Sequence, residues 1–233
     1  MFTGLKQASK PSLGALPVSV NDWAPAGFPT PQIQCNCQDV SGGLFNSSGG
    51  APGVIVGNPS FQQPAPNGRK GVLMSGAQGF TFNKDSANYL GVSGTTFIYL
   101  KFGALTGSQR AIMGKRLSPS NGWFFTITPS TRKFRVRTYT GITTSVISTG
   151  TAPLDTWVYA ALTIDRDSNI IKITTETSSD STPLPSPSQV DNQQNLELGL
   201  STGINTQSMT VGYFAHFNVA LTDEQIRSLG SKL

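Results

Sequence analysis

The sequence predicts an all-β protein, an antiparallel β-sandwich of the jelly-roll kind that carries one short C-terminal helix. Short stretches of β-branched and aromatic residues recur along the chain from about residue 79, and such stretches are typical of strands. Turn residues such as those in PSTR and DRDSN separate them at hairpin lengths. Charged residues make up only 12% of the chain, which contains 25 glycines and 15 prolines. This composition is typical of many strands joined by turns.

An extended arm is predicted over residues 1–37, ahead of a sandwich that spans residues 38–233. The arm is rich in proline and small residues and lacks the sustained period of a helix or a strand. Its apolar side chains Trp23, Phe28 and Ile33 are anchors that a fully solvated linker would not carry. We therefore expect the arm to dock on the surface of a partner.

The expected strands follow one another at short intervals. In chain order they are residues 79–83, 95–102, 110–116, 122–129, 133–140, 143–149, 156–165, 170–177, 196–201 and 209–219. Antiparallel pairing of neighbours through tight turns is the simplest arrangement of such a series. Two packed sheets are therefore expected.

One expected strand has a strongly basic face. Because side chains alternate along a strand, one face of the stretch KFRVRTYT carries Lys133, Arg135, Arg137 and Tyr139. Residues 40–154 hold 11 Lys or Arg and one acid, a balance of +10 that the rest of the chain reduces to a net charge of +5. The basic face is interpreted either as a solvated sheet face or as a contact surface for an acidic glycan, nucleic acid or acidic protein. No nucleic-acid-binding motif accompanies it, so nucleic acid is not an expected partner.

The chain is predicted to end in a helix of about two turns. Thr222 is placed as the N-cap and Gln225 three residues later, which is the pattern of a capping box. Leu221 and Ile226 can close as a hydrophobic staple, and Gly230 is a natural terminator. The helix is interpreted as a plug that covers part of the sandwich.

Four motifs in order resemble the laminin-G-like, concanavalin A-like family. They are GAQGFTF at 76–82, RAIMGKRLSPSNGWFFTI at 110–127, DTWVYAALTID at 155–165 and VGYFAHFNVALTDEQIRSL at 211–229. The resemblance covers the chain from about residue 38 to its end and implies a β-sandwich. This fold serves lectins, glycoside hydrolases, adhesion modules and virion proteins, so function has to be argued from the site.

Catalysis is not expected. Retaining hydrolases of the family carry a Glu-x-Asp-x-Glu strand motif, because their mechanism needs two carboxylates about 5 Å apart. The glutamates of this chain, Glu176, Glu197 and Glu224, are not spaced in that way. His216, the only histidine, is interpreted as a structural or surface residue rather than a catalytic one.

No cofactor is expected, although the resemblance raises the question of calcium. The candidate ligands are Asp85 in NKDSAN and Asp165 with Asp167 in DRDSN. Ordinary Asx turns explain these loops equally well. The cysteines, Cys35 and Cys37, are interpreted as two thiols without a metal or redox role, with an interchain disulfide as the alternative.

Two classes of function are favoured by these observations. The first is a non-catalytic structural surface protein of a larger assembly, a phage or viral capsid decoration or appendage protein whose partners are capsid or tail proteins. The second is a lectin-like adhesion module that binds cell-surface glycans, with Trp123, Tyr139 and Tyr213 as candidate stacking platforms. Glycoside hydrolysis ranks third.

The sequence also predicts where the protein is located. No Sec signal is evident at the N-terminus and no apolar run is long enough to span a membrane. The virion surface is therefore the expected location, with export by a route other than Sec as the alternative. A homo-oligomer is compatible with this interpretation.

Overall fold

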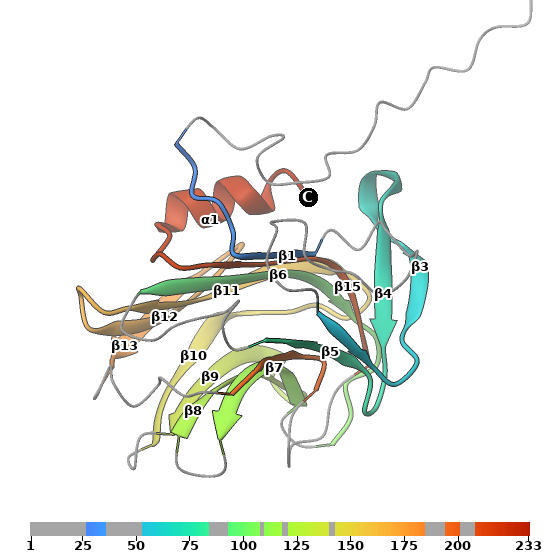
Figure 1. Cartoon of the computed structure of the whole chain (residues 1–233), viewed down its shortest axis with the longest axis horizontal. Helices are drawn as coiled ribbons and strands as arrows, with labels where there is room; N and C mark the ends of the chain where they lie inside the picture. The colour runs from blue at the N-terminus through green and yellow to red at the C-terminus, as the bar shows by residue number, and fades with distance from the viewer. Residues whose placement is uncertain are drawn as a thin grey trace, which may run out of the picture.

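The computed structural model describes two antiparallel sheets packed face to face, with one helix over the outer face of the first (Figure 1). The described residues are 27–35, 53–83, 93–107, 110–117, 121–139, 143–184, 194–200 and 208–233. The predicted all-β sandwich with a short C-terminal helix is therefore confirmed.

Sheet A, the upper layer in Figure 1, has eight strands in the order β13-β12-β11-β6-β15-β4-β3, with β1 also paired to β15. Their bounds are β1 Ile33–Cys35, β3 Ser60–Pro64, β4 Lys70–Met74, β6 Gly94–Phe102, β11 Trp157–Asp165, β12 Ile170–Thr175, β13 Ser179–Pro183 and β15 Met209–Phe217. A 3-10 turn at Pro66–Gly68 joins β3 to β4.

Sheet B, the lower layer, has seven strands in the order β10-β9-β8-β7-β14-β5-β2. Their bounds are β2 Val54–Val56, β5 Gly79–Phe82, β7 Arg110–Leu117, β8 Asn121–Thr128, β9 Lys133–Tyr139, β10 Thr143–Thr151 and β14 Leu196–Leu198. The two layers are tied at one edge, where the Asp180 carboxylate of β13 accepts hydrogen bonds from the Thr149 amide and hydroxyl of β10 at 2.8 and 3.3 Å.

The main core fills the space between the sheets. Aromatic rings dominate it: Phe125 and Phe134 stack at 5.5 Å between centroids within sheet B, and Phe82 and Phe214 stack at 5.5 Å across the two sheets. On β9, Phe134 and Val136 are buried in this core. The period of two predicted for this strand is therefore confirmed, and it turns the basic side chains to the outer face.

A second apolar cluster lies between the outer face of sheet A and the helix α1 (Asp223–Gly230). The helix begins with the predicted capping box, since Thr222 and Gln225 each accept a hydrogen bond from the other's backbone amide at 3.2 and 2.9 Å. Leu221, Ile226 and Leu229 are buried against the sheet. The interpretation of α1 as a plug is confirmed.

Polar contacts fix the helix at its first turn. The Lys172 ammonium of β12 is 2.7 Å from the Asp223 carboxylate, and the Thr174 hydroxyl donates to the same oxygen at 3.0 Å. Burial opposes ionisation of Asp223, but the contacts with Lys172, Ser179 and Thr174 together hold its pKa below the ordinary value. Sheet A therefore anchors the end of α1 that the helix dipole makes positive.

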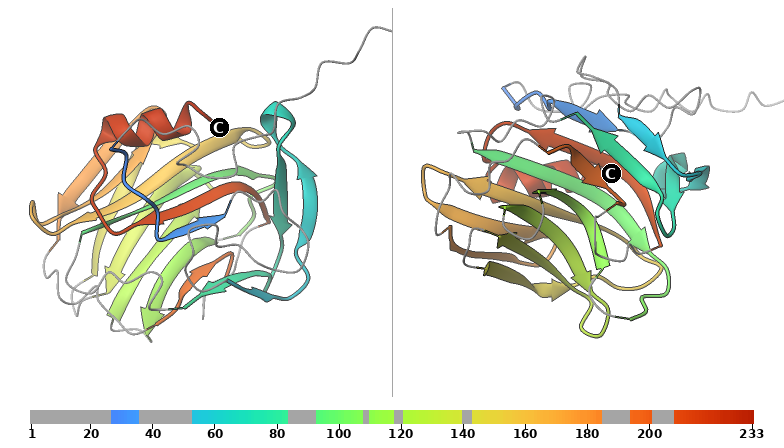
Figure 2. Two further views of the ribbon diagram at one scale, coloured as in Figure 1. Left: turned by 45° about the horizontal axis from the view of Figure 1, so that its top comes forward. Right: turned by 60° about the horizontal axis from the view of Figure 1, so that its bottom comes forward.

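Part of the predicted arm belongs to the sandwich. The β1 strand pairs with β15 in the register Ile33 to His216, and Ile33 has no exposed surface. Phe28 packs edge-on against Phe217 at 6.0 Å between ring centroids. Figure 2 shows β1 lying along β15. The boundary predicted at residue 37 thus falls after a strand of the domain, because Ile33 packs in the core of the sandwich and not on a partner. Trp23 lies outside the described residues.

None of the described helices is long and apolar enough to cross a membrane.

The packing of α1 generates a stability prediction. Ile226→Ala should lower the free energy of unfolding by about 2–5 kcal/mol, because a fully buried aliphatic side chain is lost and a cavity remains. Thr222→Ala should cost about 1 kcal/mol through the lost cap. Chemical denaturation midpoints measure both, with Glu224→Ala as an exposed control on the same helix. A neutral Ile226→Ala would contradict the assignment of α1 as a buried plug.

Candidate functional site

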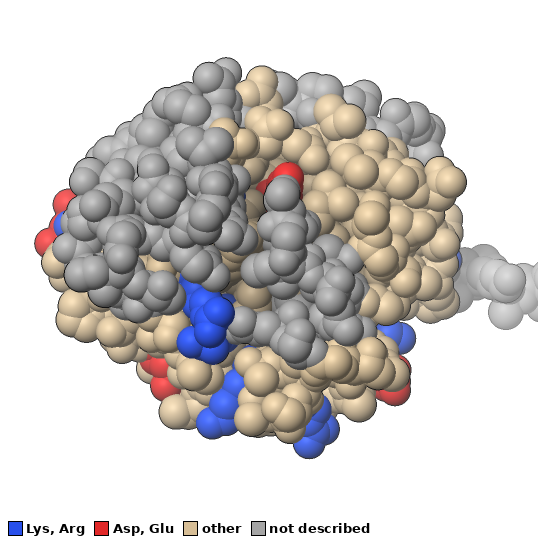
Figure 3. All heavy atoms as spheres, turned by 90° about the horizontal axis from the view of Figure 1, so that it is seen from below, with Lys and Arg blue, Asp and Glu red and all other residues tan. Residues whose placement is uncertain are grey.

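The outer face of sheet B is the first candidate surface. A row of directly paired residues can be followed across all seven strands, and residues paired in this way point to the same side of a sheet. One such row consists of Val54, Thr81, Glu197, Gly114, Phe124, Arg137 and Ser145. Figure 3, which views this face, shows basic side chains across its middle and lower part with few acids among them. The row therefore carries one acid and one guanidinium at separate points.

The three basic side chains of β9 are partly exposed on this face. They are Lys133, Arg135 and Arg137. Arg135 donates a hydrogen bond to the Ser145 hydroxyl of β10 at 3.2 Å. The sequence predicts these three residues as a surface for an anionic partner, and the structure places them together on one strand face.

Glu197 stands apart from the basic strand. It lies on β14, three strands from β9, with Gly114 and Phe124 between them in the row. Three strand spacings correspond to about 14 Å between backbones. Burial raises the pKa of the Glu197 carboxyl above its ordinary value. The acid is thus half-buried but set well away from the guanidinium of Arg137.

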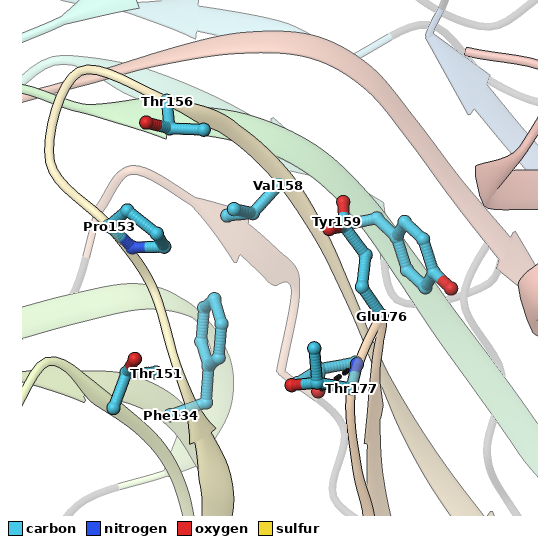
Figure 4. Close-up of a pocket in the computed structure, with 9 residues that line it drawn as sticks. Phe134, Thr151, Pro153, Thr156, Val158, Tyr159, Glu176 and Thr177 are labelled. Carbon is cyan, nitrogen blue, oxygen red and sulfur yellow. Dashed lines mark hydrogen bonds between the residues drawn. The ribbon is translucent and has the colours of Figure 1, made fainter.

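The second candidate site is a pocket at one end of the sandwich. It opens between the start of β9, the connection from β10 to β11, and the turn from β12 to β13. Its cavity volume is about 120 Å³. Its apolar floor is formed by Phe134, Pro153 and Val158 (Figure 4).

Polar groups surround that floor. Thr151, Thr156 and Thr177 contribute hydroxyls, and Glu176 contributes the single carboxylate of the lining. The Thr156 hydroxyl donates to the Leu154 carbonyl at 3.1 Å. Among the described residues, by contrast, no hydrogen bond or ion pair engages the carboxylate of Glu176, which is exposed.

The turn that carries Glu176 is held in place by side-chain hydrogen bonds. The Thr175 hydroxyl accepts from the backbone amides of Thr177 and Ser178 at 3.3 and 3.1 Å. The Ser178 hydroxyl in turn accepts from the Gly150 amide at 3.2 Å. A Cβ at Gly150 would lie 2.6 Å from the Thr177 hydroxyl oxygen, so only glycine allows this approach. The pocket is therefore a built feature of three connected segments.

The electrostatic influence of Glu176 reaches the neighbouring phenols. Burial first, and then the negative charge of Glu176, raise the pKa of Tyr159 and of Tyr99 above the ordinary value. The phenols consequently stay protonated around neutral pH, as donors rather than as charged groups.

The aromatic residues predicted to stack on a glycan lie elsewhere. Trp123 has no exposed surface and Tyr213 is only 2% exposed, because Trp123 points into the main core and Tyr213 faces the cluster beneath α1. Neither ring presents a face to a sugar, so the structure removes both from the stacking candidates. The side chain of Tyr139 lies outside the described residues.

One aromatic residue that the sequence analysis did not single out is partly exposed. Trp157 lies on the outer face of sheet A, where its ring stacks on Tyr99 at 5.0 Å between centroids. The Lys101 ammonium is 5.8 Å from the same ring centroid. Gly71 and Gly212 leave room for the indole, since a Cβ at either position would come within 3.3 Å of it. Trp157 is therefore held by the fold.

The predicted calcium ligands form a turn. The Asp165 carboxylate accepts hydrogen bonds from the backbone amides of Asp167 and Ser168 at 3.0 and 3.1 Å. Burial opposes ionisation of Asp165, but these hydrogen bonds outweigh it and lower its pKa. This is the Asx turn that the sequence offered as the alternative. Asp85 lies outside the described residues, which contain no group of three or more acidic, histidine or cysteine side chains that could hold a metal.

His216 and Cys35 are interior residues. The imidazole has no exposed surface; its Nδ1 is 3.0 Å from the Thr96 hydroxyl and its Nε2 is 3.0 Å from the Asn218 carboxamide oxygen. Burial lowers the pKa of His216 to about 3, so the ring is neutral. The interpretation of His216 as structural is consistent with this placement. Cys35 is a buried thiol of β1, and Cys37 lies outside the described residues.

Comparison with known proteins places this arrangement in a family. A family model described as the concanavalin A-like lectin/glucanases superfamily matches residues 68–227. No curated protein matches the sequence significantly.

Solved structures share the fold at low sequence identity. The binding domain of botulinum neurotoxin serotype D matches with a TM-score of 0.65 and 14% identity over 86% of this chain and 50% of that one. A structure of botulinum neurotoxin type C, described by its interaction with two ganglioside molecules, gives 0.63 and 12% over 88% and 51%. The sialidase of Trypanosoma rangeli, in complex with sialic acid, gives 0.65 and 14% over 84% and 32%. This chain therefore covers about half of each botulinum neurotoxin structure and about a third of the sialidase structure. The likeness concerns the fold.

The buried imidazole generates a pH prediction. His216 is neutral in the folded protein above about pH 3, whereas an unfolded histidine takes up a proton below about 6.5. Acid therefore favours the unfolded state, and stability should fall between pH 6.5 and 4 with a slope on the order of 1.4 kcal/mol per pH unit from this residue.

The measurement is a series of urea midpoints from pH 7 to pH 4 for the wild type and His216→Gln. The difference between the two curves isolates the imidazole, because the carboxylates contribute to both. Parallel curves would contradict the neutral, buried assignment.

Proposed function

Because the chain belongs to the concanavalin A-like lectin/glucanase superfamily, we propose that it is a non-catalytic, lectin-like module that binds carbohydrate. The observation that carries this proposal is the pocket at the end of the sandwich. An unengaged carboxylate and several threonine hydroxyls surround an apolar floor there. Specific carbohydrate recognition uses the same combination, in which acceptors and donors meet sugar hydroxyls while apolar atoms contact the C–H faces of the ring.

Charge favours a sugar over a cationic ligand at this pocket. Arg132 and Lys133 immediately precede Phe134 of the floor, and Lys133 pairs with Thr151 of the wall. These cations oppose the approach of an ammonium group to Glu176. Neutral hydroxyl groups, which donate to the carboxylate without a charge of their own, meet no such barrier.

The solved relatives support a glycan as the ligand class. One botulinum neurotoxin structure is described by its interaction with gangliosides, and the sialidase structure contains sialic acid. Both are longer proteins than this chain, so their ligands suggest a class and no particular residue.

The non-catalytic part of the proposal rests on the count of carboxylates at the pocket. Glycoside hydrolysis by the common mechanisms needs two carboxyl groups about 5–10 Å apart on either side of the scissile bond. The described lining of the pocket provides Glu176 alone. A single carboxylate can accept sugar hydrogen bonds, but it cannot serve as both acid and nucleophile or base.

A second proposal is that the module is a surface component of a larger assembly, such as a phage or viral capsid decoration or appendage protein. Its location would then be the virion surface, with export by a route other than Sec as the alternative. The specific observation is the anchoring of the N-terminal segment. β1 pairs with the edge of β15, and Phe28 packs against Phe217 in the cluster beneath α1. The described chain thus begins at a fixed place on sheet A, and we propose that residues 1–26 dock on a capsid or tail protein.

Glu176→Gln tests the carbohydrate proposal. Hydrogen bonds to a charged group are worth about 1.5–3 kcal/mol, so the loss of charge should weaken binding of a neutral glucan about tenfold or more. Titration calorimetry with laminarin and dextran oligosaccharides measures the dissociation constants, with Glu224→Gln on α1 as the matched control. The same mixtures should release no reducing sugar. Absence of binding, equal binding by both variants, or steady turnover would contradict the proposal.

Deletion of residues 1–26 tests the second proposal. Because β1 and Phe28 remain, the melting temperature should stay unchanged, while incorporation into particles should be lost. Co-expression with the neighbouring structural genes and electron microscopy of purified particles would measure incorporation. Equal incorporation with and without the segment would exclude docking through it.

A further inference from the structure

The basic face of β9 is unusual in its surroundings. Each of its cations is flanked by neutral residues in the paired positions of both neighbouring strands. The pairs are Lys133 with Thr128 and Thr151, Arg135 with Thr126 and Ile147, and Arg137 with Phe124 and Ser145. Cross-strand pairs are where a sheet usually places opposite charges together. None of the residues in these directly paired positions is acidic.

Arg137 is the most informative of the three cations about a missing anionic partner. Its side chain is partly buried, and its Nε atom is buried without a hydrogen-bond partner. No hydrogen bond, ion pair or ring contact engages its guanidinium among the described residues. Withdrawing a cation from water without a partner is unfavourable, and a guanidinium is well suited to bind a carboxylate or sulfate through two parallel N–H groups.

The acid on the same face does not satisfy Arg137. Glu197 lies about 14 Å away across three strand spacings. The Phe124 ring lies over Gly114 between them, so closely that a Cβ on this glycine would be 2.6 Å from the ring. Glu197 is therefore not placed to pair with Arg137.

The neighbours of the cations indicate what kind of molecule would carry the anion. Hydroxyl groups alternate with the basic residues on the adjoining strands: Thr126 and Thr128 on β8, and Ser145 and Thr151 on β10. Lys133 pairs with Thr151, which also lines the pocket, so one end of the basic row lies next to a pocket residue in the sheet. From Lys133 to Arg137 the row extends about 13 Å along β9.

We propose that Arg137, together with Arg135 and Lys133, binds the carboxylate or sulfate group of an acidic glycan along β9 on the outer face of sheet B. The inference rests on the proposed function for the nature of the carrier, and it names the class of glycan. A chain seated in the pocket continues along the basic row, where its acid group forms a charge-assisted pair with the guanidinium. An acidic protein segment is the competing occupant, but it has no use for the flanking hydroxyls or the pocket.

Binding of two charged polysaccharides and their neutral counterpart tests the proposal. Dextran sulfate presents sulfates, polygalacturonate presents carboxylates, and dextran presents neither. Binding is measured by titration calorimetry or biolayer interferometry at 150 mM salt, where weak nonspecific attraction is screened. The variants are Arg137→Gln and Arg137→Lys. Arg227→Gln is the matched control, because it removes the same charge from an exposed position on α1.

We expect Arg137→Gln to weaken binding of at least one charged polysaccharide about tenfold, with Arg137→Lys in between and Arg227→Gln unchanged. Dextran affinity should be unaffected by all three variants and reduced by Glu176→Gln, which separates this site from the pocket. An equal loss in Arg137→Gln and Arg227→Gln would reveal attraction to net charge alone and overturn the proposal. Failure of both charged polysaccharides to bind, or tighter binding of polyglutamate, would also overturn it. Unchanged thermal midpoints confirm that the variants are folded.

Discussion

The structure depends on one strand that is buried on both faces. All nine residues of β15 are buried. One face of the strand packs into the core between the sheets, and the other is covered by α1. Along one edge β15 pairs with β6, and along the other it pairs with β4 and then with β1. The helix, the N-terminal segment and the neutral state of His216 all follow from the need to exclude water from this strand.

The same constraint determines where ligands can bind. Because α1 packs on the outer face of sheet A, the aromatic residues beneath it serve packing. Among the described residues, no helix covers the outer face of sheet B. Its outward side chains therefore include the partly exposed cations of β9. The pocket arises at the end of the sandwich, where the connections of both sheets meet. Binding groups are thus confined to one face and one rim.

Much of the fold was predictable because its signals are local. The alternation on β9 and the capping box at Thr222 are read directly from neighbouring residues. The early strands β1 to β4 were missed, since β1 and β2 have three residues each and β3 ends in proline. The prediction of stacking residues was wrong for another reason. The alternation of side chains assigns Trp123 and Tyr213 each to one face of its sheet, but it does not reveal which faces are buried by other parts of the fold. The pocket had no sequence signal, because its walls come from three separated segments that meet only in the fold.

The charge asymmetry of the sequence becomes an asymmetry in space. Among the described strands of sheet B, Glu197 is the one acidic residue, whereas β7 and β9 each carry three basic residues. The acids that follow residue 154 lie largely at the ends of β11 to β13 and on α1, where they are used in turns, caps and the contact with Lys172. Of these acids, Asp165 and Asp223 are engaged in contacts of sheet A and α1, and Asp180 joins β13 to β10. A positive field over the outer face of sheet B is the consequence, and it favours anionic ligands at the face where the buried Nε of Arg137 has no hydrogen-bond partner among the described residues.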